Sequence, residues 1–146
     1  MDYEAKLIQG LEAAPEAAAI RQEVFMGEQG FSKEFDKLDE TAWHAVIYVQ
    51  GKAAATGRLF KGRSGWHIGR VAVRKEFRGL GLGAAVMREL EAKAQELGAE
   101  AIRLSAQVQA MGFYERLGYT PEGEEYYDEH CPHIAMQKRL RSANNE

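Results

Sequence analysis

Apolar and polar residues follow two different periods along the 146-residue chain. Short stretches in which they alternate indicate half-buried β-strands, because successive side chains of a strand point to opposite faces. Longer stretches with apolar residues three and four positions apart indicate helices with one buried face. The pattern predicts strands over residues 3–8, 43–49, 53–60, 66–73, 101–106 and 133–140, and helices over residues 15–24, 83–97 and 113–118.

The fourth predicted strand changes its alternation halfway along. Trp66 and Ile68 share one face, but Val71 and Val73 fall on the opposite one, so the pattern slips at residues 69–70. Two unrelated burial patterns meeting by chance would also give such a slip. A β-bulge explains it directly, because one extra residue bends the strand and leaves backbone groups unpaired. The sequence therefore predicts a bulge whose free backbone groups face a ligand.

A glycine-rich junction connects this strand to the longest predicted helix. Gly79, Gly81 and Gly83 alternate after Arg78 in the sequence RKEFRGLGLGA of residues 74–84. Glycine lets the backbone turn tightly and approach a ligand, and the unpaired N–H groups of a helix start attract anions. An ordinary strand-to-helix loop also uses glycine. Three glycines and an arginine at this place together favour a phosphate site.

Length and composition are those of an ordinary globular protein with one core. Apolar residues make up 45% and charged residues 28% of the chain, which fits neither a disordered nor a fibrous protein. No apolar run approaches the ~20 residues that span a bilayer, and the acidic N-terminus lacks the features of a signal peptide. We expect a cytoplasmic protein with one domain over residues 1–141 and a polar tail over residues 142–146. The single cysteine, Cys131, has no disulfide partner within the chain.

Two motifs together resemble the GNAT N-acetyltransferase superfamily. Arg78, Gly81 and Gly83 occupy the defining positions of its acyl-CoA pyrophosphate loop, Arg-x-x-Gly-x-Gly, and FYERLGY at residues 113–119 matches its aromatic-Tyr-x-x-x-Gly-aromatic helix. The predicted order of elements matches the family over almost the whole chain. Further segments are similar to the ElaA-like branch: residues 21–25, 28–29, Asp36, Asp39, His44, residues 68–71 and residues 132–136.

The resemblance implies an α/β fold, classed as α+β by some schemes. Its mixed central sheet would have about six to seven strands, a bulged fourth strand and about four flanking helices. The fourth and fifth strands would splay apart and admit the pantetheine arm of acetyl-CoA.

The implied reaction moves an acetyl group from acetyl-CoA to a primary amine by direct attack in a ternary complex, without a metal. Tyr114, in the second motif, would be the general acid that protonates the departing thiolate. A tyrosine packed for its ring is the alternative without that motif. The residues that the resemblance assigns to acetyl-CoA are Val71, Ala72, Val73, Arg78, Gly79, Leu80, Gly81, Leu82, Gly83 and Ala84.

The general base and the acceptor site are left open by the sequence. Many GNAT relatives carry a glutamate on the bulged strand, and residues 66–73 contain no carboxylate. A lone histidine is more often structural than catalytic, and acidic loops are more often solvated surface. Candidates for the base, directly or through water, are His67, His133 and Glu28. Candidates for the acceptor site are Glu28, Asp39, His67 and His133. Further acidic residues that would attract a cationic amine are Asp36, Asp128 and Glu129.

Two other functions compete with the transferase. One is a non-catalytic acyl-CoA-binding or regulatory module that kept the cofactor loop. The other is a dinucleotide-dependent oxidoreductase, because Gly79, Gly81 and Ala84 satisfy G-x-G-x-x-A. The five residues 74–78 between strand and first glycine argue against the second. A net charge of −3 argues against nucleic acid. We expect acetyl-CoA and an amine as partners, no membrane, and a monomer or homodimer.

Overall fold

The computed structural model describes residues 2–140, so the predicted tail over residues 142–146 lies outside the described residues. Seven strands form one sheet in the order β1-β2-β3-β4-β5-β7-β6. β4 and β5 pair in parallel and all other neighbours are antiparallel, which confirms the mixed sheet. The strands are β1 Glu4–Gln9, β2 Trp43–Val49, β3 Lys52–Gly62, β4 Gly65–Val73, β5 Ala101–Gln107, β6 Thr120–Asp128 and β7 Cys131–Arg139.

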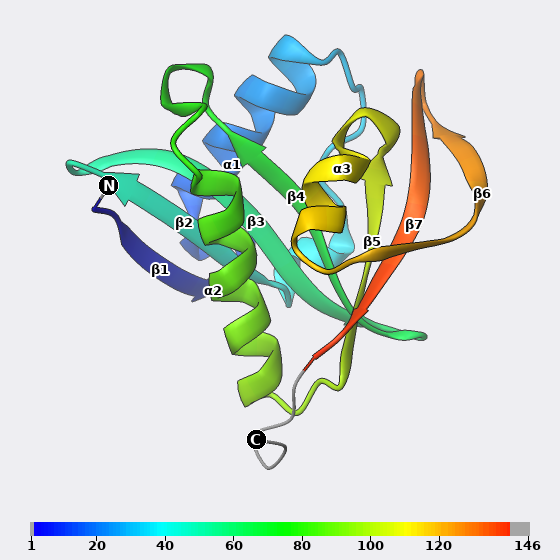
Figure 1. Ribbon diagram of the computed structural model, residues 1–146. Coiled ribbons are helices and arrows are strands. Elements are labelled where there is room, and N and C mark those ends of the chain that lie inside the picture. Colours follow the sequence, from blue (N-terminus) through cyan, green and yellow to red (C-terminus); the bar gives the residue numbers. More distant parts are fainter. Residues whose placement is uncertain (1, 141–146) are drawn as a thin grey trace.

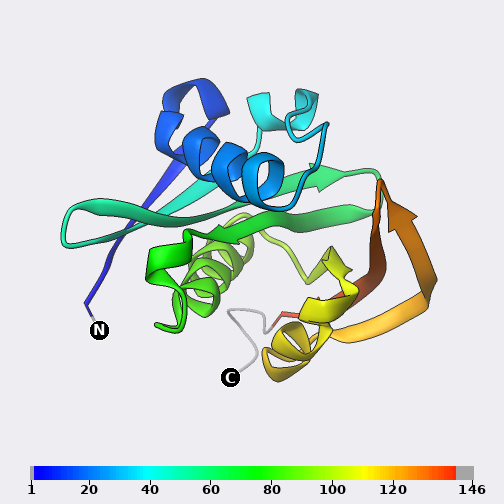
Figure 2. The same ribbon diagram turned by 90° about the horizontal axis from the view of Figure 1, so that it is seen from above.

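Helices cover both faces of the sheet (Figure 2). On one face α1, Pro15–Arg21, continues without a break into a π-helical segment, Gln22–Glu28. On the other face lie α2, Leu82–Glu96, and α3, Met111–Arg116. Short 3-10 turns, among them Lys37–Glu40 in the loop before β2, complete the set. The N-terminal helical region is one element, so residues 2–140 contain three α-helices, where the resemblance implied about four.

The two faces of the sheet bury two separate hydrophobic clusters. Ile47 and Leu59 pack with Leu90 of α2, whereas Val46 packs with Ile20 of α1 on the opposite face. Neighbouring residues of β2 therefore point into different clusters, and both are fully buried. Because both faces are covered, the central strands read as apolar runs and lack a clean alternation.

The predicted bulge is confirmed in β4. Thr56 of β3 pairs with Ala72 and Arg58 pairs with Gly69, so the single residue Gly57 stands opposite residues 70–71. Arg70 takes φ 54°, the left-handed conformation that side chains other than Gly, Asn and Asp seldom adopt. The slip in alternation and the register shift in the sheet therefore have the same cause.

Gly57 lets α2 approach the sheet closely at the bulge. A Cβ atom on Gly57 would lie 2.5 Å from Cγ1 of Val86 and 3.1 Å from Cδ1 of Leu90. We therefore expect Gly57→Ala to lower the free energy of unfolding by about 1–3 kcal/mol, because the helix must move away from the strand. Chemical denaturation measures this. Gly69→Ala is the control, since its Cβ meets nothing within 4 Å; an equal loss in both variants would contradict the steric explanation.

β4 and β5 separate soon after they begin. They pair only at Trp66 with Ile102 and at His67 with Arg103, and from there the two strands diverge beside α3 (Figure 1). The remainder of β4, from Ile68 to Val73, has no partner strand on the β5 side. The backbone of the bulged segment is therefore left unpaired on that side, as the resemblance implied.

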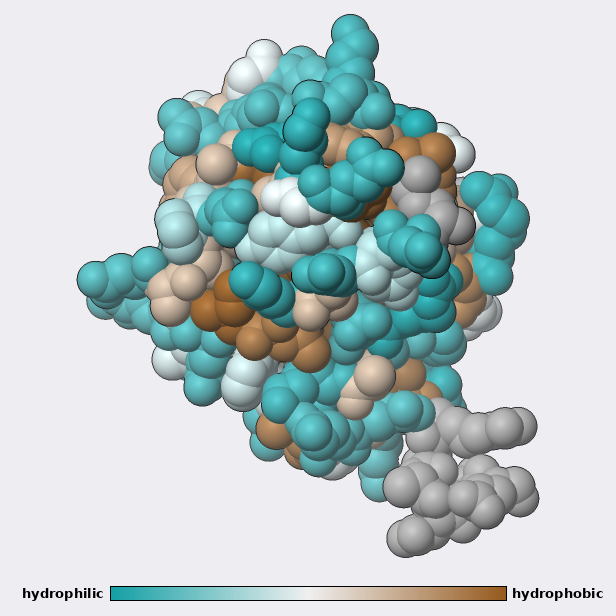
Figure 3. Space-filling model, turned by 90° about the vertical axis from the view of Figure 1, so that its left-hand side faces the viewer, coloured by the Kyte–Doolittle hydropathy of each residue, from teal (hydrophilic) through white to brown (hydrophobic). Residues whose placement is uncertain are grey.

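The outer edges of the sheet are β1 and β6. Figure 3 views the molecule from the side that lies to the left in Figure 1, where β1 runs, and the surface there is mostly hydrophilic with a few separate hydrophobic patches. Among residues 2–140 the structure has no helix that is both long enough and apolar enough to cross a membrane.

Candidate active site

Two adjoining cavities meet where β4 and β5 diverge. The first, which we call the loop groove, has a volume of about 350 Å³ and runs along the end of β4 and the start of α2. The second, which we call the bulge cavity, has a volume of about 210 Å³ and lies between the bulge, the loop after the π-helical segment and β5. Val71, Ala110 and Tyr114 line both. The two cavities therefore adjoin at these three residues, and we refer to them together as the cleft.

The glycine-rich junction forms one wall of the loop groove. Gly79 and Gly81 take φ 83° and 77°, and Gly81 caps the N-terminus of α2. Both need glycine for this left-handed backbone, and neither has a neighbour within 4 Å of a Cβ position. Gly83 instead allows close packing, because its Cβ would lie 3.2 Å from Cζ of Phe113 in α3. The start of α2 is thus open to an anion.

Nine of the ten residues that the resemblance assigned to acetyl-CoA line the loop groove. They are Val71, Ala72, Val73, Arg78, Gly79, Gly81, Leu82, Gly83 and Ala84. Leu80 does not line it and its side chain is exposed. The backbone turn at two left-handed glycines points this one side chain to solvent.

Arg78 and Glu28 form an ion pair at the rim of the loop groove. The Arg78 guanidinium donates to both carboxylate oxygens of Glu28 at 2.6 and 2.7 Å, and its Nε donates to the backbone oxygen of Val73 at 3.0 Å. The hydrogen bond lowers the pKa of Glu28 and raises that of Arg78. Glu28, expected at the acceptor site, lines neither cavity and instead ties the end of the π-helical segment to β4.

Tyr114 lies at the junction of the two cavities. Its ring packs edge-on against Phe113 and Tyr119, with centroids 4.9 and 6.0 Å away. Burial raises the pKa of Tyr114 to about 12, because the phenolate would be poorly solvated. The hydroxyl is therefore protonated at neutral pH, as a proton donor must be.

His133 of β7 is buried and lines the bulge cavity. Its Nδ1 lies 2.9 Å from the backbone oxygen of Cys131. Because that oxygen only accepts, the neutral ring carries its proton on Nδ1 and keeps the lone pair of Nε2 free. Of the four residues expected at the acceptor site, His133 is the one that the structure brings into the cleft.

His67 and Asp39 lie outside the cleft. His67 is on β4 before the divergence, stacks on Phe60 with centroids 5.2 Å apart, and places Nε2 3.0 Å from Oγ of Ser64. Burial lowers its pKa. Asp39 is 3% exposed and lines neither the loop groove nor the bulge cavity. The sequence placed both residues near the cleft, and the structure uses both for packing and internal bonding.

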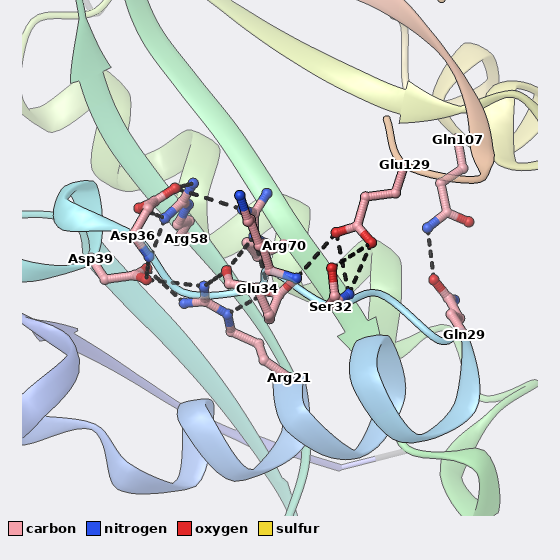
Figure 4. A network of polar contacts seen from close by, with 11 residues as sticks. Arg21, Gln29, Ser32, Glu34, Asp36, Asp39, Arg58, Arg70, Gln107 and Glu129 are labelled. Carbon is pink, nitrogen blue, oxygen red and sulfur yellow. Dashed lines mark hydrogen bonds and ion pairs between the residues drawn. The ribbon is translucent and has the colours of Figure 1, made fainter. Parts of the chain in front are cut away.

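Asp39 belongs to a largely buried charged cluster beside the bulge cavity (Figure 4). Arg21 of α1 donates from Nη1 to Asp39 Oδ1 at 2.7 Å and from Nε to Glu34 Oε2 at 2.9 Å. Burial opposes the ionisation of Asp39, yet the hydrogen bond from Arg21 lowers its pKa to about 2. The charged cluster contains Arg21, Glu34, Asp36, Asp39, Arg58 and Arg70. Three cations and three anions balance one another.

Carboxylates expected to attract an amine are mostly engaged within the protein. Asp36 and Asp39 accept hydrogen bonds from Arg58 at 2.7 and 2.8 Å. Glu129 accepts from the backbone N–H groups of Ser32 and Lys33 and from the Ser32 hydroxyl. Asp128 alone among these expected carboxylates lines the bulge cavity. The expected acidic attraction for a cation is thus weaker than the sequence indicated.

Several polar residues of the bulge cavity escaped the sequence prediction. Glu34 is 5% exposed, and burial raises its pKa. Its loop has no periodicity, so nothing in the sequence marks it. Arg70 falls at the slip in alternation, which is a signal that could have identified it. The others are Gln29, Lys33, Ser105 and Gln107, with Gln107 donating to Gln29 at 2.8 Å.

Within residues 2–140 the structure contains no group of three or more His, Cys, Asp or Glu side chains arranged to hold a metal ion. The arrangement that does exist is an open helix N-terminus, an unpaired strand segment and a protonated tyrosine. Together these suit an anionic cofactor with a long flexible arm.

Comparisons with known proteins agree with this geometry. The family model of the acetyltransferase (GNAT) domain matches residues 10–140. The uncharacterised N-acetyltransferase YjcF of Bacillus subtilis (strain 168) is 35% identical over 131 residues, which cover 87% of this chain and 93% of that protein.

Solved structures give the same result. An acyl-CoA N-acyltransferase from Pseudomonas aeruginosa has a TM-score of 0.84 with 28% identity, and Escherichia coli ElaA has 0.82 with 25%; each covers 94% of this chain and 99% of its own. The likeness to ElaA agrees with the similarity in residues 21–25 and 132–136. The chain therefore belongs to the GNAT acetyltransferases, a family of acyltransferases that use an acyl-CoA as co-substrate.

Proposed function

We propose that the protein transfers an acetyl group from acetyl-CoA to a primary amine by direct attack within a ternary complex. The observation that carries the proposal is the position of Tyr114, which lines both the loop groove at the start of α2 and the adjoining polar bulge cavity. A cofactor in the groove and an acceptor in the cavity would meet at this residue, which is the arrangement that a ternary complex needs.

The loop groove would hold acetyl-CoA. The pyrophosphate would lie on the N–H groups of residues 79–84 at the start of α2, and the pantetheine arm would run along residues 71–73, which lack a partner strand on the β5 side. Arg78 would add positive charge at the rim, beside its partner Glu28.

The bulge cavity would hold the acceptor. The amine lone pair attacks the thioester carbon, a backbone N–H of the bulged strand stabilises the oxyanion, and the C–S bond breaks as the amide forms. Tyr114 gives its proton to the departing thiolate. Nε2 of His133 takes the proton that the amine loses, directly or through a water molecule. Asp39 and His67 have no part in this mechanism, because neither lines the cleft.

A non-catalytic acyl-CoA-binding module is the second candidate. The missing glutamate on β4 favours it, whereas the position of Tyr114 between the loop groove and the polar bulge cavity favours catalysis. The family match over residues 10–140 argues against the dinucleotide-dependent oxidoreductase. A single catalytic domain over residues 1–141, a cytoplasmic location, a monomer or homodimer and the lack of a nucleic-acid partner stay predictions.

Thermal unfolding tests the cofactor. We expect acetyl-CoA at 100 times its Kd to stabilise the folded protein by about 2.7 kcal/mol, which raises Tm by roughly 10 °C. NADH at the same concentration should leave Tm unchanged. A shift with NADH and none with acetyl-CoA would refute the proposed cofactor.

A pair of glycine variants locates the binding site. Gly81→Val should abolish the shift, because valine disfavours φ 77° and its side chain enters the groove. Gly98→Val is the matched control: Gly98 also has positive φ, 92°, and open space around Cβ, but lies at the other end of α2 and outside the groove. Equal shifts in the two variants would place the phosphate elsewhere.

A further inference from the structure

Some of the charged residues that line the bulge cavity form ion pairs within the protein, and others do not. Glu34 is held by Arg21 and Arg70 within the balanced charged cluster, so it offers little net charge to a ligand. Two other charged groups of the cavity, Lys33 and Asp128, have no hydrogen bond or ion pair from their side chains in the described part of the chain. One exposed cation and one exposed anion, neither of them paired through its side chain, therefore lie at the rim of the same cavity.

Lys33 is placed firmly at the cavity by its own backbone. Its N–H donates to Glu129 Oε2 at 3.1 Å, and the preceding N–H of Ser32 donates to Glu129 Oε1 at 2.9 Å. Figure 4 shows this carboxylate reaching from the β6–β7 turn to the loop. The backbone of the loop is thus anchored at Ser32 and Lys33, while the Lys33 ammonium has no hydrogen-bond partner among residues 2–140.

Arg70 belongs to the balanced charged cluster, but it still offers unused hydrogen-bond donors. Its Nε is occupied by Glu34, at 2.9 Å to Oε2 and 3.1 Å to the backbone oxygen, and Nη2 lies 3.6 Å from Asp36 Oδ2. Nη1 has no hydrogen-bond partner among residues 2–140. The guanidinium is therefore held at Nε and has an unpaired donor at Nη1. The backbone of Arg70 is strained, with φ 54°. Strain of this kind persists where surrounding contacts hold it, typically at ligand sites.

We propose that the acceptor carries an anionic oxygen group, a carboxylate or a phosphate, in addition to its reactive amine, and that Lys33 and Arg70 bind this group. Guanidinium and ammonium groups bind such oxygens by short, charge-assisted hydrogen bonds. Asp128 would face the ammonium form of the amine before it loses its proton. An acceptor of the amino-acid type satisfies both free charges, whereas a polyamine would place cations beside Lys33 and Arg70. The inference rests on the proposed acetyl transfer.

The test uses amines in matched pairs with acetyl-CoA: amino acids with their carboxamides, and aminoalkyl phosphates with the corresponding aminoalcohols. Mass spectrometry of the mixture identifies acetylated products, and kcat/KM is then measured for both members of each acetylated pair. We expect the anionic member to be favoured by about 10- to 100-fold, since a hydrogen bond to a charged group contributes on this scale. The favoured pair distinguishes carboxylate from phosphate.

Two variants assign the preference to the cavity. Lys33→Met should reduce the preference by about tenfold through KM for the anionic member, with little change for the neutral one. Lys37→Met is the control. This substitution removes the same charge from the same loop, but Lys37 lines neither cavity. Equal use of acid and amide by the wild-type protein, or a polyamine as the best acceptor, would overturn the inference.

The acceptor site can also be tested without turnover. With coenzyme A bound, the anionic amines should raise Tm in the wild-type protein and less so in Lys33→Met. Failure of all the amines to raise Tm would refute the anion site. Absence of any product while these shifts are intact would instead contradict the proposed transferase reaction.

Discussion

Replacing Tyr114 with phenylalanine should lower the rate of acetyl transfer by on the order of 10²–10⁴-fold, the usual contribution of a general acid. The change removes one oxygen and keeps the ring that packs against Phe113 and Tyr119. Acetyl-CoA binding should therefore remain within about threefold of wild type, since the phosphate site on α2 is untouched. We expect the turnover rate to fall and cofactor binding to be kept, because the thiolate would leave without receiving a proton.

Single-turnover rates with saturating acetyl-CoA measure this effect apart from product release. Tyr127→Phe is the matched control, because Tyr127 loses the same atom, is 69% exposed and lines neither cavity. If Tyr114→Phe acetylates its acceptor at nearly the wild-type single-turnover rate, Tyr114 is not the acid, and the proposed mechanism loses its central residue.

Replacing Arg21 with methionine should lower the free energy of unfolding by about 3–5 kcal/mol. Arg21 is fully buried and donates to Asp39 and Glu34, both of which are at most 5% exposed. Arg58 and Arg70 would still contact these carboxylates, but three anions, of which Glu34 and Asp39 are buried, would face two cations. Uncompensated buried charge is costly because the protein interior solvates it poorly.

Urea denaturation compares this variant with two others. Arg88→Met, on the exposed face of α2, should change stability by less than about 0.5 kcal/mol. Arg21→Lys should fall between the two, because it restores the charge and loses the two-pronged geometry. A soluble Arg21→Met protein as stable as Arg88→Met would show that the charged cluster contributes no net stability, and a variant that fails to fold while Arg21→Lys folds would support the prediction.

Much of the fold could be predicted from the sequence, at positions where local interactions determine the structure. The parity change between Ile68 and Val71 predicted the bulge, because burial on alternate faces is a local signal. Gly98 lies directly after the helix predicted over residues 83–97, Gly118 is the last residue of the helix predicted over residues 113–118, and both take positive φ. The glycine loop was readable for the same reason, since left-handed backbone requires glycine at Gly81.

β6 was missed because it lacks the signals of a buried strand. Its sequence TPEGEEYYD has almost no apolar alternation, and nearly all of it is exposed. Gly123 takes φ 80°, and the pairing with β7 shifts register between Glu122 and Tyr126. An edge strand of this kind is fixed by its neighbour and not by its own pattern.

The polar residues that line the cleft could not be predicted from the sequence, for a different reason. Glu34 meets Arg70 across 36 residues of chain, and Glu28 meets Arg78 across 50. Such pairs depend on how loops cross the sheet, which periodicity does not report. The sequence could mark Arg21, Asp36 and Asp39 as characteristic of a branch of the family. Only the fold shows that they neutralise one another in one charged cluster.

The early parting of β4 and β5 leaves an unpaired edge on each of these strands inside the molecule, in addition to the two outer edges of the sheet. Exposed strand edges invite pairing with other chains, and proteins commonly shield them with charge, proline or covering elements. Here helices stand on both faces of the sheet (Figure 2), so we expect a foreign β-strand with its side chains to be excluded from this edge. We expect a slender unbranched chain to be admitted. The unpaired backbone groups of β4 would then be available to a small molecule and protected from aggregation.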